Sequence, residues 1–172
     1  MIQFGCQDMV KQVRRILLKH PKDAFIDQPT IDRQSSELNY SKTPNFDIAC
    51  KDYELFLNLI RSFGPEIHFL PTSNTSLDSI YTHDPCIVTN GGVILCNMGK
   101  EQRSNEPDDI EKYFRAIQVP ILGRIELPGT LEGGDIVWID ERTVAVGEGY
   151  RSNMEGIDQF KHLLGDLVDT VI

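Results

Sequence analysis

Leu131-Glu132-Gly133-Gly134-Asp135 places two carboxylates around a Gly-Gly pair, directly before the apolar segment Ile136-Val137-Trp138-Ile139. A second acidic corner, His83-Asp84-Pro85, precedes the apolar segment Cys86-Ile87-Val88-Thr89 in the same way. Taken singly, each corner is compatible with an ordinary turn, because Gly-Gly and Asp-Pro are common in loops. Taken together, two carboxylates at the entrances of two strands can bind one planar cation such as a guanidinium.

The two corners belong to a repeat. Arg103-Ser104-Asn105 recurs as Arg151-Ser152-Asn153, and Ile87-Val88 is matched by Ile136-Val137. An acidic residue precedes the first strand of each copy. Several matches at a spacing of about 50 residues indicate a repeated supersecondary unit.

Each copy predicts the same order of elements: a strand, a tight turn, a returning strand, a loop that carries the arginine, a helix and a closing strand. In the first copy the strands and helix are expected at residues 86–89, 93–97, 107–117 and 119–127. In the second copy they are expected at residues 136–139, 143–147, 155–164 and 167–172.

The first third of the chain predicts a variant of this unit. Strands are expected at residues 13–19 and 24–26, and the polar, turn-rich residues 27–45 are expected to form a mobile loop. A helix over residues 48–63 and a closing strand over residues 66–70 follow. Four apolar residues of this helix are expected to face inward: Leu55, Phe56, Leu59 and Ile60.

The 172 residues predict a single α/β domain, with units at residues 1–80, 81–127 and 128–172. The content of 40% apolar and 25% charged residues is typical of a globular protein, and the net charge of −9 argues against a nucleic-acid partner. No apolar run approaches the length of a membrane span. Because the chain stops within an apolar strand, we expect it to be the front part of a longer protein.

Cysteine and histidine positions predict neither disulfides nor a metal site. The N-terminus has no apolar run typical of a signal peptide, so free thiols in a reducing cytoplasm are expected. No C-x-x-C spacing connects the four cysteines: Cys6, Cys50, Cys86 and Cys96. No paired spacing connects the four histidines either: His20, His68, His83 and His162. Asn90-Gly91-Gly92 is typical of a hairpin turn, not of a phosphate-binding loop, so no cofactor is expected.

Four motifs together resemble the guanidino-group-modifying superfamily, which includes dimethylarginine dimethylaminohydrolase, arginine deiminase and glycine amidinotransferase. They are Tyr81-Thr82-His83-Asp84-Pro85, residues 98–107, residues 131–135 and Gly147-Glu148-Gly149-Tyr150-Arg151-Ser152-Asn153. The resemblance covers about residues 40–172 and is closest to the dimethylarginine dimethylaminohydrolase branch. It implies a five-bladed α/β propeller (the pentein fold) of ββαβ units around a central channel, of which about three units are present here.

The resemblance also implies roles for the matching residues. Asp84 would hydrogen-bond the substrate guanidinium, and Glu132 would bind it from another side and assist proton movement. Arg103 and Arg151 resemble the arginines that hold the amino-acid carboxylate of arginine-like substrates, although each is also compatible with a surface charge. Asp135 is expected to shape the Gly-Gly corner or to join the site.

The chemistry implied by the family uses a cysteine thiolate that attacks the guanidinium carbon and a histidine that protonates the leaving amine. Both residues would lie beyond the end of this sequence, and none of the four cysteines matches the nucleophile. His83 is expected to be structural, His162 to face solvent and Cys86 to be packed in the core. We therefore expect the substrate-binding part of an enzyme acting on arginine or methylated arginine, by C–N hydrolysis or amidino transfer, without activity of its own.

Two alternatives stay open: a non-catalytic binding module for guanidinium ligands, and a structural propeller piece whose motifs are only turns. The coding sequence after Ile172 would separate the enzyme from the binding module. An incomplete propeller would leave strand edges and apolar faces uncovered, so a homo-oligomer is expected.

Overall fold

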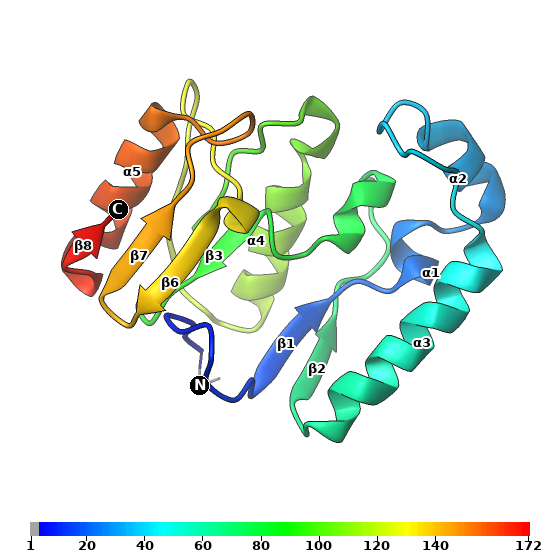
Figure 1. The fold of residues 1–172 in the computed structure, drawn as a ribbon, viewed down its shortest axis with the longest axis horizontal. Helices are drawn as coiled ribbons and strands as arrows, with labels where there is room; N and C mark the ends of the chain where they lie inside the picture. The colour runs from blue at the N-terminus through cyan, green and yellow to red at the C-terminus, as the bar shows by residue number, and fades with distance from the viewer. Residues whose placement is uncertain (1–3) are drawn as a thin grey trace. The chain divides into compact units, whose positions relative to one another are not determined.

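The computed structural model describes residues 4–172, which form two compact units (Figure 1). One unit comprises residues 12–82, and the other combines residues 83–172 with residues 4–11. Both units contain helices and small sheets, which confirms the α/β fold class. The single-domain organisation and its three repeat boundaries stay predictions.

The unit that contains residues 83–172 is built from two copies of one ββαβ motif. An antiparallel hairpin is followed by a helix, and a closing strand then pairs in parallel with the second strand of the hairpin. The first copy consists of β3 (Cys86–Val88), β4 (Val93–Leu95), α4 (Glu106–Ala116) and β5 (Ile121–Arg124). The second copy consists of β6 (Ile136–Asp140), β7 (Thr143–Val146), α5 (Met154–Leu164) and β8 (Thr170–Val171). Three short 3-10 helices lie between these elements: Glu101–Arg103, Gly133–Asp135 and Gly165–Leu167.

One apolar core joins the two copies. Side chains alternate along a strand, so residues that lie opposite each other in a hairpin share one face of the sheet. Ile87 and Ile94 lie opposite each other in the first hairpin, and Trp138 lies opposite Val144 in the second. All four belong to one buried cluster that also contains Phe160 of α5.

The repeated Arg-Ser-Asn tripeptide marks the start of a helix in each copy. Asn105 and Asn153 are the N-cap residues of α4 and α5. The Asn153 side chain accepts a hydrogen bond from Gly156 N at 2.9 Å, which satisfies one of the free N–H groups of the first turn. The repeat therefore places an arginine two residues before each helix cap.

The unit of residues 12–82 has a parallel two-stranded sheet, β1 (Arg15–Leu18) and β2 (Glu66–Phe69), with helices between the two strands. The long helix α3 (Phe46–Ser62) and strand β2 follow the predicted order. Three shorter helices complete this unit: α1 (Pro21–Ala24), α2 (Gln28–Gln34) and a 3-10 helix at Leu77–Ile80.

Two predictions for this unit are wrong. The expected strand at residues 24–26 does not form, because His20 caps α1 by accepting a hydrogen bond from Lys22 N at 3.0 Å, and a proline occupies the first turn. Residues 27–45, expected as a loop, contain α2. Asp27 caps this helix through Thr30 N at 2.8 Å, and again a proline follows.

The expected inward face of α3 is also wrong. Leu55 is 62% exposed, and Phe56 and Leu59 are exposed as well, whereas Leu57 is only 1% exposed. Apolar residues lie on two faces of α3, and the rest of its unit covers only one of them. The apolar stripe with the clearest helical spacing is the face that remains open.

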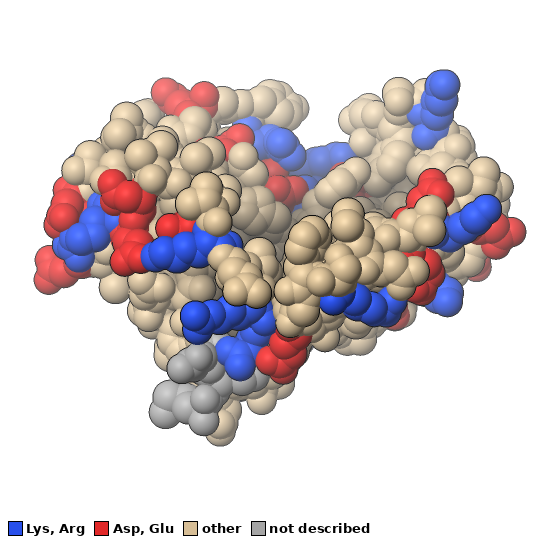
Figure 2. Space-filling view, turned by 60° about the horizontal axis from the view of Figure 1, so that its bottom comes forward, with Lys and Arg blue, Asp and Glu red and all other residues tan. Residues whose placement is uncertain are grey.

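The distribution of charged side chains and the character of the helices relate to the predicted partners of the chain. On the face drawn in Figure 2, Lys and Arg side chains are interspersed with Asp and Glu side chains. Of the helices in residues 4–172, none combines the length and the apolar character that a membrane span requires.

Candidate functional site

The Gly-Gly pair allows the two acidic corners to meet. Gly133 N donates a hydrogen bond to Asp84 O at 2.9 Å. A Cβ atom on Gly133 would lie 2.2 Å from His83 O, and a Cβ on Gly134 would lie 2.8 Å from Asp84 Oδ1. Only residues without a Cβ permit this approach, so the glycines bring the entrance of β6 against the entrance of β3.

Arg103 lies among three carboxylates. Its Nη1 atom donates to Asp84 Oδ2 at 2.7 Å and lies 4.0 Å from Glu132 Oε2. Its Nε and Nη2 atoms donate to the two oxygens of Glu106 at 3.0 and 2.8 Å. Two parallel bonds to one carboxylate make a bidentate pair with defined geometry. The Asp84 and Glu132 carboxylates thus lie within 4.0 Å of one guanidinium nitrogen.

The Arg103 guanidinium is buried but stays charged. Its side chain is 2% exposed. Burial opposes the charge, but the Glu106 and Asp84 carboxylates outweigh that effect and raise the pKa of Arg103 above its ordinary value. A positive charge is therefore a permanent part of this site.

Glu132 is the most enclosed carboxylate of the site, with a side chain that is 1% exposed. Its Oε1 atom accepts from Gly99 N at 3.2 Å, and its Oε2 atom lies 2.8 Å from Arg151 Nη1. Among the described residues, Oε2 accepts no hydrogen bond of good geometry. Burial raises the pKa of the Glu132 carboxyl, while Arg151 and Arg103 partly oppose the rise.

Asp135 is tied to the second Arg-Ser-Asn loop. Ser152 Oγ donates to Asp135 Oδ2 at 2.6 Å and accepts from Glu132 N at 3.1 Å. The buried hydroxyl thereby connects both carboxylate residues of the Gly-Gly corner to the loop that carries Arg151.

The structure brings together Asp84, Glu132, Arg103 and Arg151, and links Asp135 to them through Ser152. The two arginines differ in exposure, since the Arg151 side chain is 42% exposed. Reasoning from the sequence gave no role to Glu106 or Ser152, although both lie in motifs that carry the resemblance. An acidic residue three positions after Arg103 was an available sign, because residues so spaced at a helix start can pair. The ligand-binding roles implied by the resemblance stay predictions.

The cysteines near this site are packed thiols. Burial raises the pKa of Cys86 to about 12 and the pKa of Cys96 well above its ordinary value. A thiol with such a pKa stays protonated near neutral pH and is a poor nucleophile. His162 is exposed on α5. Within residues 4–172 no group of three or more His, Cys, Asp or Glu side chains is arranged to hold a metal ion.

Comparison with known proteins finds relatives that include dimethylarginine dimethylaminohydrolases and arginine deiminases. N(G),N(G)-dimethylarginine dimethylaminohydrolase of Pseudomonas aeruginosa is 28% identical over 151 residues, which are 88% of this chain and 56% of the relative. Arginine deiminase of Listeria welshimeri is 32% identical over 90 residues, or 49% of this chain and 22% of the relative. This chain thus spans about half the length of the first relative and less of the second.

The fold also matches solved structures. A mutant of the Pseudomonas aeruginosa dimethylaminohydrolase complexed with citrulline superimposes with a TM-score of 0.77, at 24% identity, over 94% of this chain and 61% of that one. The family model described as N,N dimethylarginine dimethylhydrolase, eukaryotic, matches residues 20–168. The chain therefore belongs to this family of the guanidino-group-modifying superfamily.

Proposed function

We propose that the chain is the substrate-binding part of an enzyme that modifies the guanidino group of arginine or methylated arginine. The reaction would be C–N hydrolysis or amidino transfer through a covalent cysteine intermediate. One observation carries the proposal: the buried Glu132 Oε2 atom, which shares Arg103 Nη1 as a neighbour with Asp84, accepts no hydrogen bond of good geometry. Arg151 Nη1 lies 2.8 Å from this oxygen, but the pair lacks good hydrogen-bond geometry. A ligand N–H in line with the oxygen would satisfy the buried acceptor and stabilise the site.

The proposed roles follow from charge and position. Asp84 and Glu132 bind the planar guanidinium from two sides. A unit-charge pair 4 Å apart contributes about 4 kcal/mol at an effective dielectric constant near 20, which offsets the repulsion between the carboxylates. Arg151, which is partly exposed, holds the ligand's carboxylate. Arg103, whose nitrogens donate to Glu106 and Asp84, balances the charge of those carboxylates, and Asp135 supports the Gly-Gly corner.

We propose that the chain by itself binds the ligand without converting it, and that it uses no cofactor. The raised pKa values of Cys86 and Cys96 support the first point, because neither thiol forms a thiolate near neutral pH. The free thiols of Cys6 and Cys50 suit a reducing cytoplasm, which we propose as the location.

Calorimetric titration of the 172-residue chain with asymmetric dimethylarginine, arginine and citrulline tests the proposal. Binding is expected for the wild type and is expected to fall at least about tenfold in Asp84→Asn and Glu132→Gln, since each removes a charged hydrogen-bond acceptor. The matched controls are Asp158→Asn and Glu148→Gln, which change exposed carboxylates. Unchanged binding in Asp84→Asn and Glu132→Gln would contradict the site.

A second candidate, a non-catalytic binding module for guanidinium ligands, is favoured by the same protonated, buried cysteines. It predicts the same titration results, but it does not require a catalytic histidine and cysteine from a longer protein. Release of citrulline and an amine from dimethylarginine by the purified chain would exclude this candidate and would also contradict the proposed inactivity.

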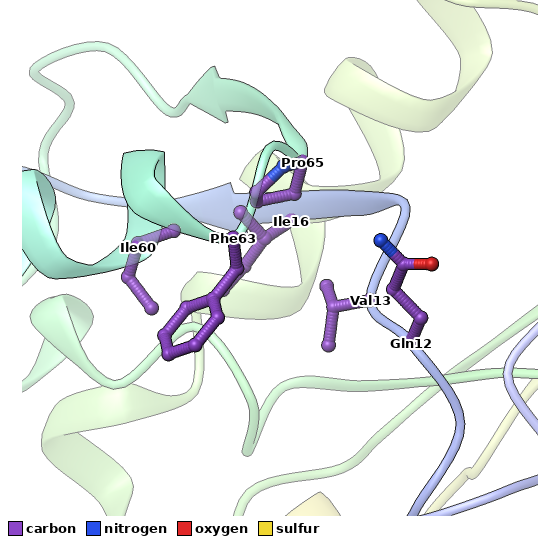
Figure 3. Close-up of a pocket in the computed structure, with 6 residues that line it drawn as sticks. All are labelled: Gln12, Val13, Ile16, Ile60, Phe63 and Pro65. Atoms are coloured by element: carbon purple, nitrogen blue, oxygen red, sulfur yellow. The ribbon is translucent and has the colours of Figure 1, made fainter.

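We further propose that the ββαβ copies are blades of a partial α/β propeller, about three of five, and that open edges support a homo-oligomer. The β4 and β7 strands each have two neighbours in their sheets, whereas β1 pairs only with β2 within residues 4–172. Beside β1 and α3 lies an open apolar pocket of about 230 Å³, lined by Gln12, Val13, Ile16, Ile60, Phe63 and Pro65 (Figure 3). Phe63 is 62% exposed there, and such a surface favours a second copy of this chain.

Light scattering at micromolar concentration tests the oligomer. A dimer or higher species is expected, and Phe63→Asp is expected to shift it to monomer, because a charge would be buried in an apolar contact. Leu127→Asp, at an exposed apolar position of the other unit, is the matched control. A monomeric wild type would contradict the oligomer without affecting the ligand site.

A further inference from the structure

We infer that Glu106 is a positioning residue of the guanidinium site. It holds Arg103 so that one nitrogen faces Asp84 and Glu132, and its own carboxylate compensates the positive charge of Arg103. The inference deepens the proposed function and rests on it. Neither the sequence motifs nor the expected ligand contacts assign a role to Glu106.

The geometry of the pair supports this role. Glu106 is the first residue of α4 and is buried, and its two oxygens accept from Nε and Nη2 of Arg103. Because the guanidinium is planar, two bonds on one edge fix the direction of the remaining nitrogen, Nη1. That nitrogen donates to Asp84 at 2.7 Å and lies 4.0 Å from Glu132. The position of Glu106 at a helix N-terminus also favours its negative charge.

The consequence for a ligand is electrostatic. With Glu106 ionised, its charge compensates that of Arg103, so Asp84 and Glu132 keep the negative charge that attracts a cation. Without the Glu106 charge, Asp84 and Glu132 must neutralise more of the Arg103 charge, so less of their negative charge is left for a ligand. The site would then become less selective for a cationic ligand over a neutral one of similar shape.

Two ligands separate this role from general support of the fold. Asymmetric dimethylarginine carries a charged guanidinium, whereas citrulline carries a neutral ureido group. Both have the same α-carboxylate. In titrations of the 172-residue chain, Glu106→Gln is expected to weaken dimethylarginine binding about tenfold and citrulline binding less than about twofold. Glu106→Asp keeps the charge and is expected to recover most of the selectivity. Glu101→Gln removes an exposed carboxylate from the neighbouring 3-10 helix and is the matched control.

The two affinities distinguish a charge-based role of Glu106 from a purely structural one. Equal weakening of both ligands in Glu106→Gln would show a purely structural role and overturn the inference, as would wild-type selectivity in that variant. If Glu106→Gln does not fold, the ratio of the two affinities in Glu106→Asp decides, because an unchanged affinity for both ligands supports a charge-based role and an equal loss of both contradicts it. A wild type that binds neither ligand overturns the proposed function itself, and the inference with it.

Discussion

The two ββαβ copies share a backbone plan but use their arginines differently. Both copies place Arg-Ser-Asn before a helix, and the next residue is Glu106 in the first copy and Met154 in the second. Arg103 is buried and hydrogen-bonded to Glu106. Arg151 has the exposed Met154 in the place of Glu106 and pairs instead with Glu132 of the Gly-Gly corner. The residue after the tripeptide thus distinguishes a buried arginine from a partly exposed one.

This difference shows which features the repeat determines. The hairpin, the helix cap and the tripeptide place an arginine at equivalent points of both copies. The neighbouring side chain then decides whether that arginine serves the internal charge balance or stays available to a ligand.

The largest expected effect comes from removing each arginine in turn. Arg103→Met leaves the Glu106 and Asp84 carboxylates without their buried counter-charge and is expected to destabilise the fold by about 3–5 kcal/mol. Arg151→Met removes a partly exposed partner and is expected to cost about 1 kcal/mol. Urea unfolding followed by Trp138 fluorescence measures both. Equal losses would remove the distinction between the two arginines.

Gly133, where the two copies meet, should give the next largest effect. Gly133→Ala puts a Cβ atom 2.2 Å from His83 O, so the backbone must shift, and a loss of about 1–3 kcal/mol is expected. Gly149→Ala in the same copy meets no atom within 4 Å and is expected to change stability by less than about 0.5 kcal/mol. The same unfolding assay compares them. A Gly133→Ala protein as stable as Gly149→Ala would show that the close contact is dispensable.

Much of the fold was predictable because its apolar periodicity is strong. Both copies show short apolar runs on either side of a turn and a helical spacing afterwards, and the observed strands and helices overlap every segment expected there. The failures lie in the first third of the chain, where helices α1 and α2 are short. Their cap and proline residues were present in the sequence, but the polar composition of residues 27–45 favoured a loop.

The site was predictable only in part. Two acidic corners and two arginines could be selected because they recur at equivalent points of a repeat. The contacts of Glu106 and Ser152 depend on how two loops fold against each other, which local spacing does not determine. Periodicity also misassigned Leu55 and Leu59, because it identifies an apolar face without showing whether anything covers it.

A smaller difference is expected between the two serines of the repeated tripeptide. Ser152 is buried and bonds both Asp135 and the Glu132 backbone, whereas Ser104 is exposed. Ser152→Ala is expected to cost about 1 kcal/mol, and Ser104→Ala less than about 0.5 kcal/mol. Thermal unfolding of the two variants tests this order. A larger loss of stability from Ser104→Ala than from Ser152→Ala would contradict the stabilising role of the Ser152 hydrogen bonds.

The smallest effect should appear as opposite pH dependence in the two copies. Burial raises the pKa of Glu132 above its ordinary value of 4.5, so the folded state binds the proton more tightly than the unfolded state. That contribution to stability is fully present below 4.5 and is lost as pH rises through the raised pKa. In the first copy, Arg115 and Arg124 lower the pKa of Glu111, so its contribution is present above 4.5 and is lost as pH falls through the lowered pKa.

Unfolding free energies measured between about pH 3 and pH 7 separate the two groups. Glu132→Gln should remove a fall in stability on the alkaline side of 4.5, and Glu111→Gln should remove a fall on the acidic side. Glu148→Gln, at an exposed position, is the matched control. If Glu132→Gln instead altered only the acidic side, the charges of Arg103 and Arg151 would outweigh burial at this carboxylate. The second copy would then resemble the first in its electrostatics as well as in its backbone.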